Sequence, residues 1–355
     1  MIFQCRCVVW REDVILENPD VEASFDSTGK HCFSGFTSAG EPHADYTGSL
    51  YEYSHRKLSY DSDILNAFAG ISTILFKRIE DNSTKEINSV YGLPVNVFDW
   101  ALLWQANKTA HRRSGGWPSW SWCGWSGGVN MLLSDLKYSG LQDWLSNHTW
   151  IDWITYSVDG RPQTCIPSDC VYQRSETQWP PLTHPPIVKA QPHDVLSTER
   201  FCIANAQDAL RLQSQLVYDQ AGCPPLPHFA SLSAKFYLQV TDNLTNDDEP
   251  LGRSYKICDS TKNPCGYIWI SKLWIHRPDE AYDFIVLSDA RSKGMKMLAL
   301  PASDSEREWG AYHVMLVDLV SGGNVVERVA VGYVYQEALD RAIEPGVKWK
   351  EIWLR

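Results

Sequence analysis

Apolar residues recur at every third or fourth position between residues 62 and 79, which is the spacing of one helical face. Asp61 or Ser62 can cap the first turn, and Asp81-Asn82-Ser83 follows the last apolar position. The pattern therefore predicts an amphipathic helix over residues 62–79. Its apolar positions are Ile64, Phe68, Ile71, Leu75 and Ile79.

A second helix is predicted to begin near Asn96. Pro94 precedes it, and Asn96 and Asp99 have the spacing of a capping box. The apolar residues of 97–104 cover nearly the whole circumference of a helix, which is typical of a helix buried on several sides. Further helices are predicted at about 134–146 and 205–217.

Residues 231–241 alternate between apolar and polar side chains, as a strand with one buried face does. Leu232, Ala234 and Phe236 face the predicted core. Five further runs predict strands, and Gly322-Gly323 favours a hairpin between the last two of them. Because the strands follow one another through short turns, an antiparallel sheet is favoured. The five runs are 149–158, 266–275, 283–288, 312–320 and 325–335.

Three stretches lack a sustained period and are predicted to be loops. Residues 18–50 are rich in Gly, Ser, Asp and Pro, residues 173–193 contain repeated proline, and residues 242–250 are acidic. The predicted fold is α+β. A helical section over residues 1–115, with a long N-terminal loop, packs on a mainly antiparallel, β-rich section over residues 116–355.

Composition and charge narrow the class of protein. The 355-residue chain has 44% hydrophobic and 21% charged residues, the proportions of a folded protein. Its net charge is -11 and its densest basic run is His111-Arg112-Arg113, which argues against nucleic acid and anionic membranes as partners. Residues 1–9 lack the features of a signal peptide, and no apolar run approaches the ~18 residues of a membrane helix. A cytoplasmic location is therefore expected.

No metal or cofactor site is expected from the Cys and His residues. The chain has 10 Cys, but its close pairs do not have the Cys-x-x-Cys spacing that zinc sites prefer, so buried thiols are expected. His43, His184 and His193 have no second ligand at metal-binding spacing and are interpreted as solvated loop residues. The close pairs are Cys5/Cys7, Cys165/Cys170 and Cys258/Cys265.

A Gly-x-Ser-x-Gly run, residues 124–128, is the strongest sign of an enzyme. In α/β-hydrolases such a run presents a nucleophilic serine, here Ser126, between a strand and a helix, with Asp and His partners later in the chain. His313 and either Asp283 or Asp289 are available. The chain shows no alternating β-α series, so a glycine-rich turn is favoured. A serine hydrolase stays as an alternative, and no catalytic residue is assigned.

Four tryptophans are concentrated around the same run: Trp117, Trp120, Trp122 and Trp125. Core packing is the favoured interpretation, because an indole buries a large area and its N–H needs only one partner. The alternative is a carbohydrate-binding surface on which exposed indoles stack against sugar rings.

Several stretches occur in an order that is informative as a whole. They are YEYSHRKLSYDSDILNAFAGIS at 51–72, YGLPVNVFDWALLW at 91–104 with WPSWSWCGWSGG at 117–128, YDFIVLSDA at 282–290, and YHVMLVDLVSGGNVVERVAVGYVYQEAL at 312–339 with VKWKEIWLR at 347–355. In this order they resemble the region that follows the HET domain in a large class of fungal heterokaryon-incompatibility (HET) proteins. FQCRCVVWREDV at 3–14 looks like the usual beginning of that region. The Pro-Ser-Trp-Ser-Trp run, joined to a preceding Gly-Leu-Pro helix, is the most specific element.

The resemblance spans nearly the whole chain and implies non-self recognition between fungal strains with a regulated death response. The HET domain itself has no counterpart in the sequence, so the chain corresponds to a regulatory or structural part that works through protein contacts. Either the native protein continues upstream of Met1 or it exists without that domain. HET-domain relatives are among the expected protein partners, and no catalytic residue is transferred. In the first stretch, Arg56 is predicted to pair with Asp61 or Asp63.

Overall fold

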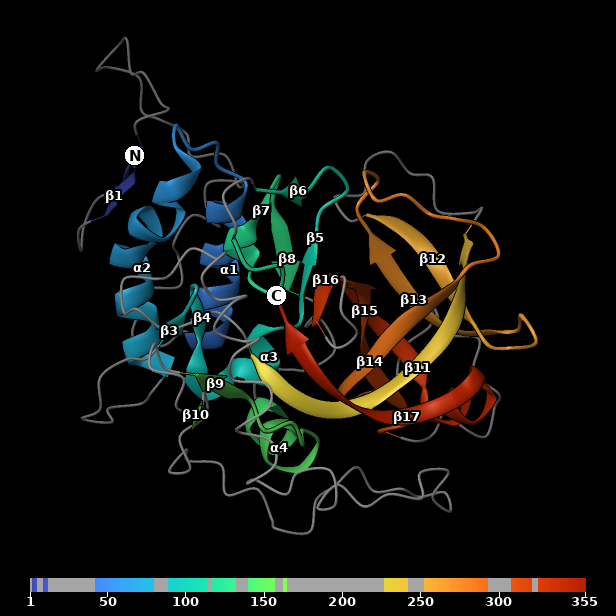
Figure 1. Cartoon of the computed structure of the whole chain (residues 1–355). Coiled ribbons are helices and arrows are strands. Elements are labelled where there is room, and N and C mark those ends of the chain that lie inside the picture. The colour runs from blue at the N-terminus through green and yellow to red at the C-terminus, as the bar shows by residue number, and fades with distance from the viewer. Residues whose placement is uncertain are drawn as a thin grey trace.

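Helices and small hairpins precede a large closed sheet in the computed structural model of the chain (Figure 1). This arrangement confirms the predicted α+β class. None of the helices in the described part of the chain combines the length and the apolar character needed to cross a membrane. The described residues are 2–4, 9–11, 42–79, 89–113, 117–131, 140–156, 162–164, 227–241, 252–292, 308–320 and 325–355. The predicted loops at 173–193 and 242–250 and the predicted helix at 205–217 lie outside them.

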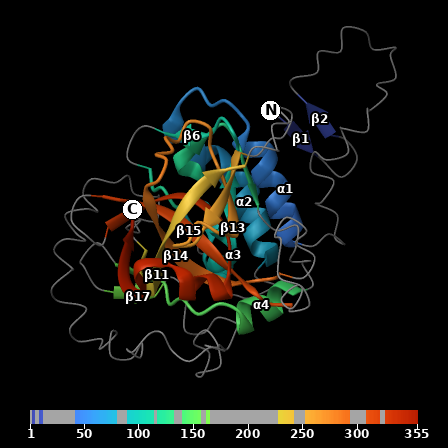
Figure 2. The same ribbon diagram turned by 90° about the vertical axis from the view of Figure 1, so that its right-hand side faces the viewer.

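Two helices, α1 (Pro42–Ser54) and α2 (Ile64–Ile79), lie together at one side of the molecule (Figures 1 and 2). The second confirms the helix predicted over 62–79. The first corrects the loop predicted over 18–50, because residues 42–50 are helical. Its pattern is weak in the sequence, and it is stabilised instead by burial of Tyr46, whose ring lies 5.5 Å from the ring of Trp100.

The helix predicted near Asn96 is present but short. A 3₁₀ turn, η4 (Val95–Val97), leads into α3 (Phe98–Ala101), all of whose residues are buried. The helix ends before Trp104 because residues 104–106 pair with another strand instead. Further along the chain, α4 (Leu141–Asn147) confirms the second half of the helix predicted at 134–146, whose first half lies outside the described residues.

Five short strand pairs of the described residues accompany the helices and the large sheet. Each pair is antiparallel; β5–β8 and β6–β7 lie between the helices and the closed sheet in Figure 1, and β9–β10 joins the large sheet where Ile154 pairs with His228 of β11 (His228–Val240). The pairs are β1 (Ile2–Gln4) with β2 (Val9–Arg11), β3 (Ser89–Val90) with β4 (Leu93–Pro94), β5 (Trp104–Ala106) with β8 (Val129–Met131), β6 (His111–Arg112) with β7 (Trp125–Ser126), and β9 (Ile154–Tyr156) with β10 (Pro162–Thr164).

Six long strands form a sheet that closes on itself, because the last strand of the series pairs again with the first. All six neighbouring pairs are antiparallel. In spatial order the strands are β11 (His228–Val240), β12 (Arg253–Cys258), β13 (Pro264–Ile270), β16 (Val325–Tyr335), β15 (Ala311–Leu319) and β14 (Ala281–Ala290).

A seventh strand, β17 (Ile343–Leu354), connects β11 directly to β16 by pairing with both. It runs antiparallel to β11 from His228↔Trp353 to Lys235↔Ile343, and parallel to the start of β16 at Val325↔Trp353. The strands β11, β14, β15, β16 and β17 therefore form a smaller closed ring within the same sheet.

The predictions for the sheet are largely confirmed. The strands expected at 231–241, 283–288, 312–320 and 325–335 are β11, β14, β15 and β16, and the last two pair as the expected antiparallel neighbours. The strand expected over 266–275 ends at Ile270, and the one expected over 149–158 begins only at Ile154, with residues 157–158 outside the described part of the chain. Both β12 and β17 were missed, the latter because Pro345-Gly346 interrupts its alternation.

One apolar core joins the helices to the sheet. The cluster of buried side chains runs from Tyr46 on α1 to Leu354 on β17 without a break between the two parts. The shared core gives no boundary between the predicted helical section, residues 1–115, and the predicted β-rich section, residues 116–355, so this division stays a prediction.

Candidate functional site

The tryptophan-rich run, residues 117–126 (the Trp segment), lies between the helices and the closed sheet. All four indoles are buried, and those of Trp120 and Trp122 have no exposed surface. The expected core packing is confirmed. These rings present no open face on which a sugar ring can stack.

Hydrogen bonds attach the Trp segment to the helical part. Ser121 Oγ donates to the carbonyl oxygen of Tyr91 at 2.6 Å, and the Trp122 indole N–H donates to that of Gly92 at 3.3 Å. The Trp122 ring also meets Phe68 of α2 edge-on, with 5.0 Å between the ring centroids. The segment thus contacts α2 and the β3–β4 hairpin at once.

Ser119 attaches the same segment to the closed sheet. Its backbone N–H donates to the carbonyl oxygen of Arg355 at 3.0 Å, and its hydroxyl oxygen accepts from the backbone N–H of Arg328 at 2.8 Å. The residue is fully buried, so water does not compete for these bonds.

Arg328 on β16 is a fully buried cation held by neutral groups. Its Nη1 donates to the carbonyl oxygen of Leu102 at 2.8 Å, and its Nη2 donates to that of Trp104. The guanidinium carbon lies 3.6 Å from the centroid of the Trp104 ring. Burial lowers the pKa of the guanidinium well below its ordinary value, and no carboxylate of the described residues acts on it. Carbonyl dipoles and an indole face therefore take the place of a counter-ion.

Two more arginines bind carbonyl oxygens of the Trp segment. Arg112 Nη1 donates to Pro118 at 3.1 Å, and Arg113 Nε donates to Trp125 at 3.0 Å. The densest basic run in the sequence is thus engaged with backbone of the same chain.

Asp61 pairs with Arg113, and Asp63 accepts a hydrogen bond from Ser62 Oγ at 3.4 Å, so the predicted pair of Arg56 with Asp61 or Asp63 is not formed. The guanidinium of Arg56 lies over the Tyr53 ring instead, 6.0 Å from its centroid. The Trp segment brings Arg113 to a carboxylate that is 52 residues away in the sequence. Sequence proximity favoured Arg56, and tertiary structure selected the distant arginine.

Ser126 lies on β7, opposite His111 of β6. Gly127 and Gly128 follow with φ values of 102° and 93°, and β8 then begins. A nucleophile elbow requires a helix after its serine. The run instead connects two strands, so the favoured interpretation as a glycine-rich turn is confirmed.

A Gly127→Ala variant is expected to lower the free energy of unfolding by about 1–3 kcal/mol, because φ is positive there and an added Cβ would lie 2.9 Å from the Cα of Ala110. Urea unfolding followed by tryptophan fluorescence measures the change. Gly70→Ala is the matched control. Gly70 lies on α2 with no atom near an added Cβ, so this variant should gain up to about 1 kcal/mol. Equal stability of the two variants would contradict the turn geometry.

The structure does not group Ser126 with the partners proposed for a hydrolase. His313 lies opposite Ser288 on the neighbouring strand. Asp283 pairs with Lys235 at 2.8 Å. Each of these side chains has a structural partner on the closed sheet.

A Ser–His pair that the sequence analysis missed lies between β14 and β15. Ser288 Oγ and His313 Nδ1 are 2.9 Å apart, the contact that activates a serine nucleophile. The two residues are only 1% and 4% exposed, so a substrate does not reach them. Burial lowers the pKa of His313 to about 3, partly offset by a hydrogen bond with the backbone of Asp289. No motif marks the pair, which only the register of the two strands creates.

Asp289 fastens α4 to the closed sheet. Its Oδ2 lies 2.9 Å from Nδ1 of His148, the residue after α4, and Gln336 Nε2 donates to its Oδ1 at 3.1 Å. Burial raises the pKa of Asp289, and the hydrogen bond with His148 lowers it in part. The His148 ring stacks on Trp309 with 3.7 Å between centroids. Asp289 therefore has a structural role: its side chain links the end of α4 to the closed sheet.

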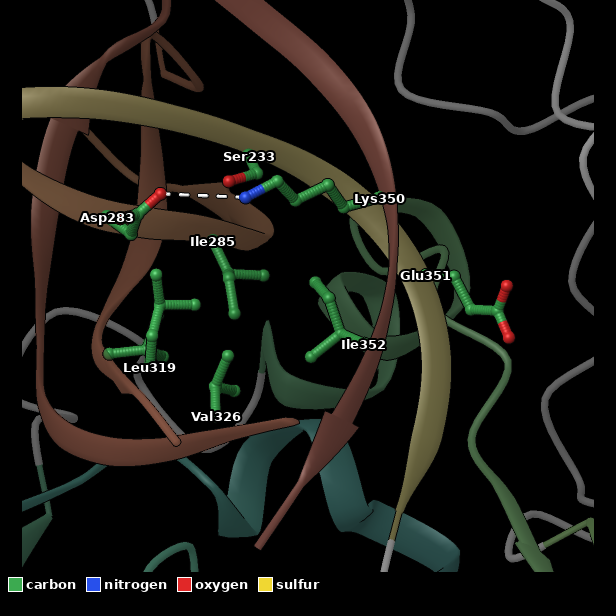
Figure 3. Close-up of a pocket in the computed structure, with 9 residues that line it drawn as sticks. Ser233, Asp283, Ile285, Leu319, Val326, Lys350, Glu351 and Ile352 are labelled. Atoms are coloured by element: carbon green, nitrogen blue, oxygen red, sulfur yellow. Dashed lines mark ion pairs between the residues drawn. The ribbon is translucent and has the colours of Figure 1, made fainter. Parts of the chain in front are cut away.

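A hollow lies inside the smaller ring of strands (Figure 3). Each of the five strands contributes to its lining, including Ile285, Leu319 and Ile352, and Lys350 reaches Asp283 across it at 3.6 Å. Its enclosed free volume is about 10 Å³, roughly that of one water-sized sphere, so the hollow is far smaller than a ligand pocket.

The described residues contain no group of three or more His, Cys, Asp or Glu arranged to hold a metal ion. Cys258 and Cys265, one of the close pairs, are free and buried. His43 was wrongly interpreted as a solvated loop residue. It lies on α1, its ring meets Trp100 at 5.3 Å, and burial lowers its pKa to about 4. His184 and His193 lie outside the described residues.

Comparison with known proteins found no matching family model, no matching curated protein and no matching solved structure.

Proposed function

We propose that this chain is the non-catalytic, cytoplasmic, regulatory part of a fungal HET-type incompatibility protein, and that it acts through protein contacts. The observation that carries the proposal is the position of the Pro-Ser-Trp-Ser-Trp run, residues 118–122. The most specific element of the resemblance is also the element that joins the helices to the closed sheet. Its polar groups are committed to internal hydrogen bonds, which supports a structural use of this run.

Restraint of an attached HET domain is the regulatory role favoured here. Helices and closed sheet share one apolar core. Because helices and sheet pack into one core, their outer surfaces keep fixed positions relative to one another, since packed cores do not deform continuously. A neighbouring domain can bind such a surface in one orientation.

The test is a death assay in a filamentous fungus. A HET domain is expressed under an inducible promoter, alone or fused upstream of residues 1–355. The isolated domain is expected to kill on induction, and the fusion is expected to survive. A fusion carrying Arg328→Met should kill again, because this substitution is expected to destabilise the part made of residues 1–355 and so to release the HET domain. A fusion that kills as efficiently as the isolated domain would refute restraint.

The hydrolase alternative has its own test. A fluorophosphonate probe applied to the folded protein is expected to label no serine, because the serine next to a histidine is buried and Ser126 lies in a glycine turn. Labelling that disappears in Ser126→Ala or in Ser288→Ala would replace the proposed function with an enzymatic one.

A further inference from the structure

The connection between α1 and α2 contains a serine that follows two basic residues. The run is RKLSY, residues 56–60, so Arg56 lies three positions and Lys57 two positions before Ser59. Protein kinases select their substrates by such patterns of charge around the acceptor hydroxyl. The pattern makes Ser59 a candidate acceptor for a kinase with an acidic substrate groove.

The segment around Ser59 is exposed and extended, as binding to a kinase requires. Lys57 and Ser59 are exposed, while Leu58 between them packs against the apolar core. Tyr60 is 70% exposed and has an extended backbone, with φ -133° and ψ 125°. The side chains on either side of Leu58 are thus open to solvent, and a second protein can reach the serine hydroxyl.

Helical structure begins directly after this serine. The 3₁₀ turn η3 (Asp61–Asp63) continues into α2, and Tyr60 at its start makes no side-chain capping hydrogen bond. The first backbone N–H groups of a helix attract anions, because they lack partners within the helix. A phosphate on Ser59 would lie at this end, where negative charge stabilises a helix.

A buried arginine lies at the same helix end with an unused donor. Arg113 has a side chain that is 2% exposed, and its Nη1 pairs with Asp61, which is 43% exposed. Its Nη2 lies on the same guanidinium carbon, is buried, and has no hydrogen-bond partner among the residues that the structure describes. A guanidinium fork with an unused donor beside a helix start is an arrangement that binds phosphate oxygens.

The charges around the serine have a small positive surplus. Within residues 55–63, Arg56 and Lys57 balance Asp61 and Asp63, and Arg113 adds one more positive charge beside them. A phosphate monoester carries about -1.5 to -2 charges at neutral pH. It would therefore meet a locally positive surface on a chain whose net charge is -11.

We propose that Ser59 is phosphorylated by a basophilic serine/threonine kinase and that the phosphate stabilises the start of α2. Ser59 Oγ forms a bond to the γ-phosphorus of ATP, the bond from that phosphorus to the oxygen of the departing ADP breaks, and the hydroxyl proton passes to the catalytic aspartate of the kinase. The phosphate then accepts hydrogen bonds from the first backbone N–H groups of η3 and from Arg113. This proposal goes beyond the proposed function and does not depend on it.

The first test incubates the full chain with MgATP and the catalytic subunit of cyclic-AMP-dependent protein kinase, and maps phosphate by mass spectrometry. The wild type is expected to carry phosphate on Ser59. Arg56→Gln should slow this modification at least about tenfold, because it removes the charge three residues before the serine. The matched control is Arg277→Gln, at a 73% exposed arginine in the β13–β14 loop, which should react within about twofold of the wild type.

Phosphate found only on other serines or threonines would overturn the proposal, and so would equal rates for the Arg56 variant and its control. If Arg56→Gln alters the circular dichroism spectrum, Lys57→Gln decides instead, since this exposed side chain carries the second basic charge of the run.

The second test asks whether the phosphate contacts the helix start. Urea unfolding followed by tryptophan fluorescence compares phosphorylated with unphosphorylated wild type. The phosphorylated protein should unfold at a higher urea concentration, and ~1 M NaCl should remove much of this gain by screening the partly exposed charges. Ser59→Ala treated with the kinase should keep its midpoint. A midpoint that phosphorylation lowers or leaves unchanged would overturn the stabilising contact.

Discussion

Replacing Arg328 with methionine is expected to lower the free energy of unfolding by about 3–5 kcal/mol. Methionine keeps most of the buried volume, so the effect comes from lost donors. The carbonyl oxygens of Leu102 and Trp104 lose their guanidinium partner, and a buried acceptor without a partner costs about 1–3 kcal/mol. Urea unfolding monitored by tryptophan fluorescence gives the value directly.

Arg277→Met is the matched control for this experiment. That side chain is 73% exposed and its pair with Glu280 lies on the surface, so its loss should change stability by less than about 0.5 kcal/mol. Arg328→Lys should also destabilise, because an ammonium group keeps the charge but lacks the planar fork that reaches two carbonyls. An Arg328→Met protein as stable as the wild type would show that this residue does not secure the junction.

Acid is expected to destabilise the protein through His313. Its pKa is lowered to about 3 by burial, against 6.5 when the ring is free, so between these values the unfolded chain binds a proton that the folded chain does not. This contribution is fully present above pH 6.5 and is lost as the pH falls toward 3, at about 1.4 kcal/mol per pH unit. His43, with a pKa lowered to about 4, acts in the same direction.

The measurement compares how steeply the free energy of unfolding changes with pH in two proteins, rather than its value at one pH. The free energy of unfolding is determined by urea titration between about pH 6 and 5 for the wild type and for His313→Gln. The variant should fall less steeply, by about 1.4 kcal/mol per pH unit at most, whatever constant offset the lost contact with Ser288 introduces. An unchanged slope in His313→Gln would mean that this ring is protonated in the folded protein.

The candidate site was only partly visible in the sequence. The Trp segment was found because tryptophans 117, 120, 122 and 125 are dense in the chain, and their burial follows from the size of the indole. The role of Arg328 left no local signal. It lies in a strand whose other residues are mostly apolar, and its partners are more than 200 positions earlier in the sequence.

Gly127 and Ser288 illustrate two ways in which a sequence motif can mislead: a match without the matching structure, and a reactive pair without any motif. The glycine run matched a catalytic pattern, yet the strand that follows it makes it a turn. Ser288 matched no pattern, yet the strand register places it against a histidine. In both cases the chemistry depended on the neighbouring element rather than on the residues of the run.

The sequence by itself determined the elements whose apolar period is strong and local: α2, β11, β14, β15 and β16, and with them the α+β class. A period of this kind fixes which face of an element is buried before any partner is present. Tertiary structure alone decided α1, the closure of the sheet by β17, the exchange of Arg56 for Arg113 beside Asp61, and the burial of Arg328 among carbonyl groups. These features depend on contacts between residues far apart in the chain, and the free energy that selects such a contact is set by the packed surroundings, which no local pattern encodes.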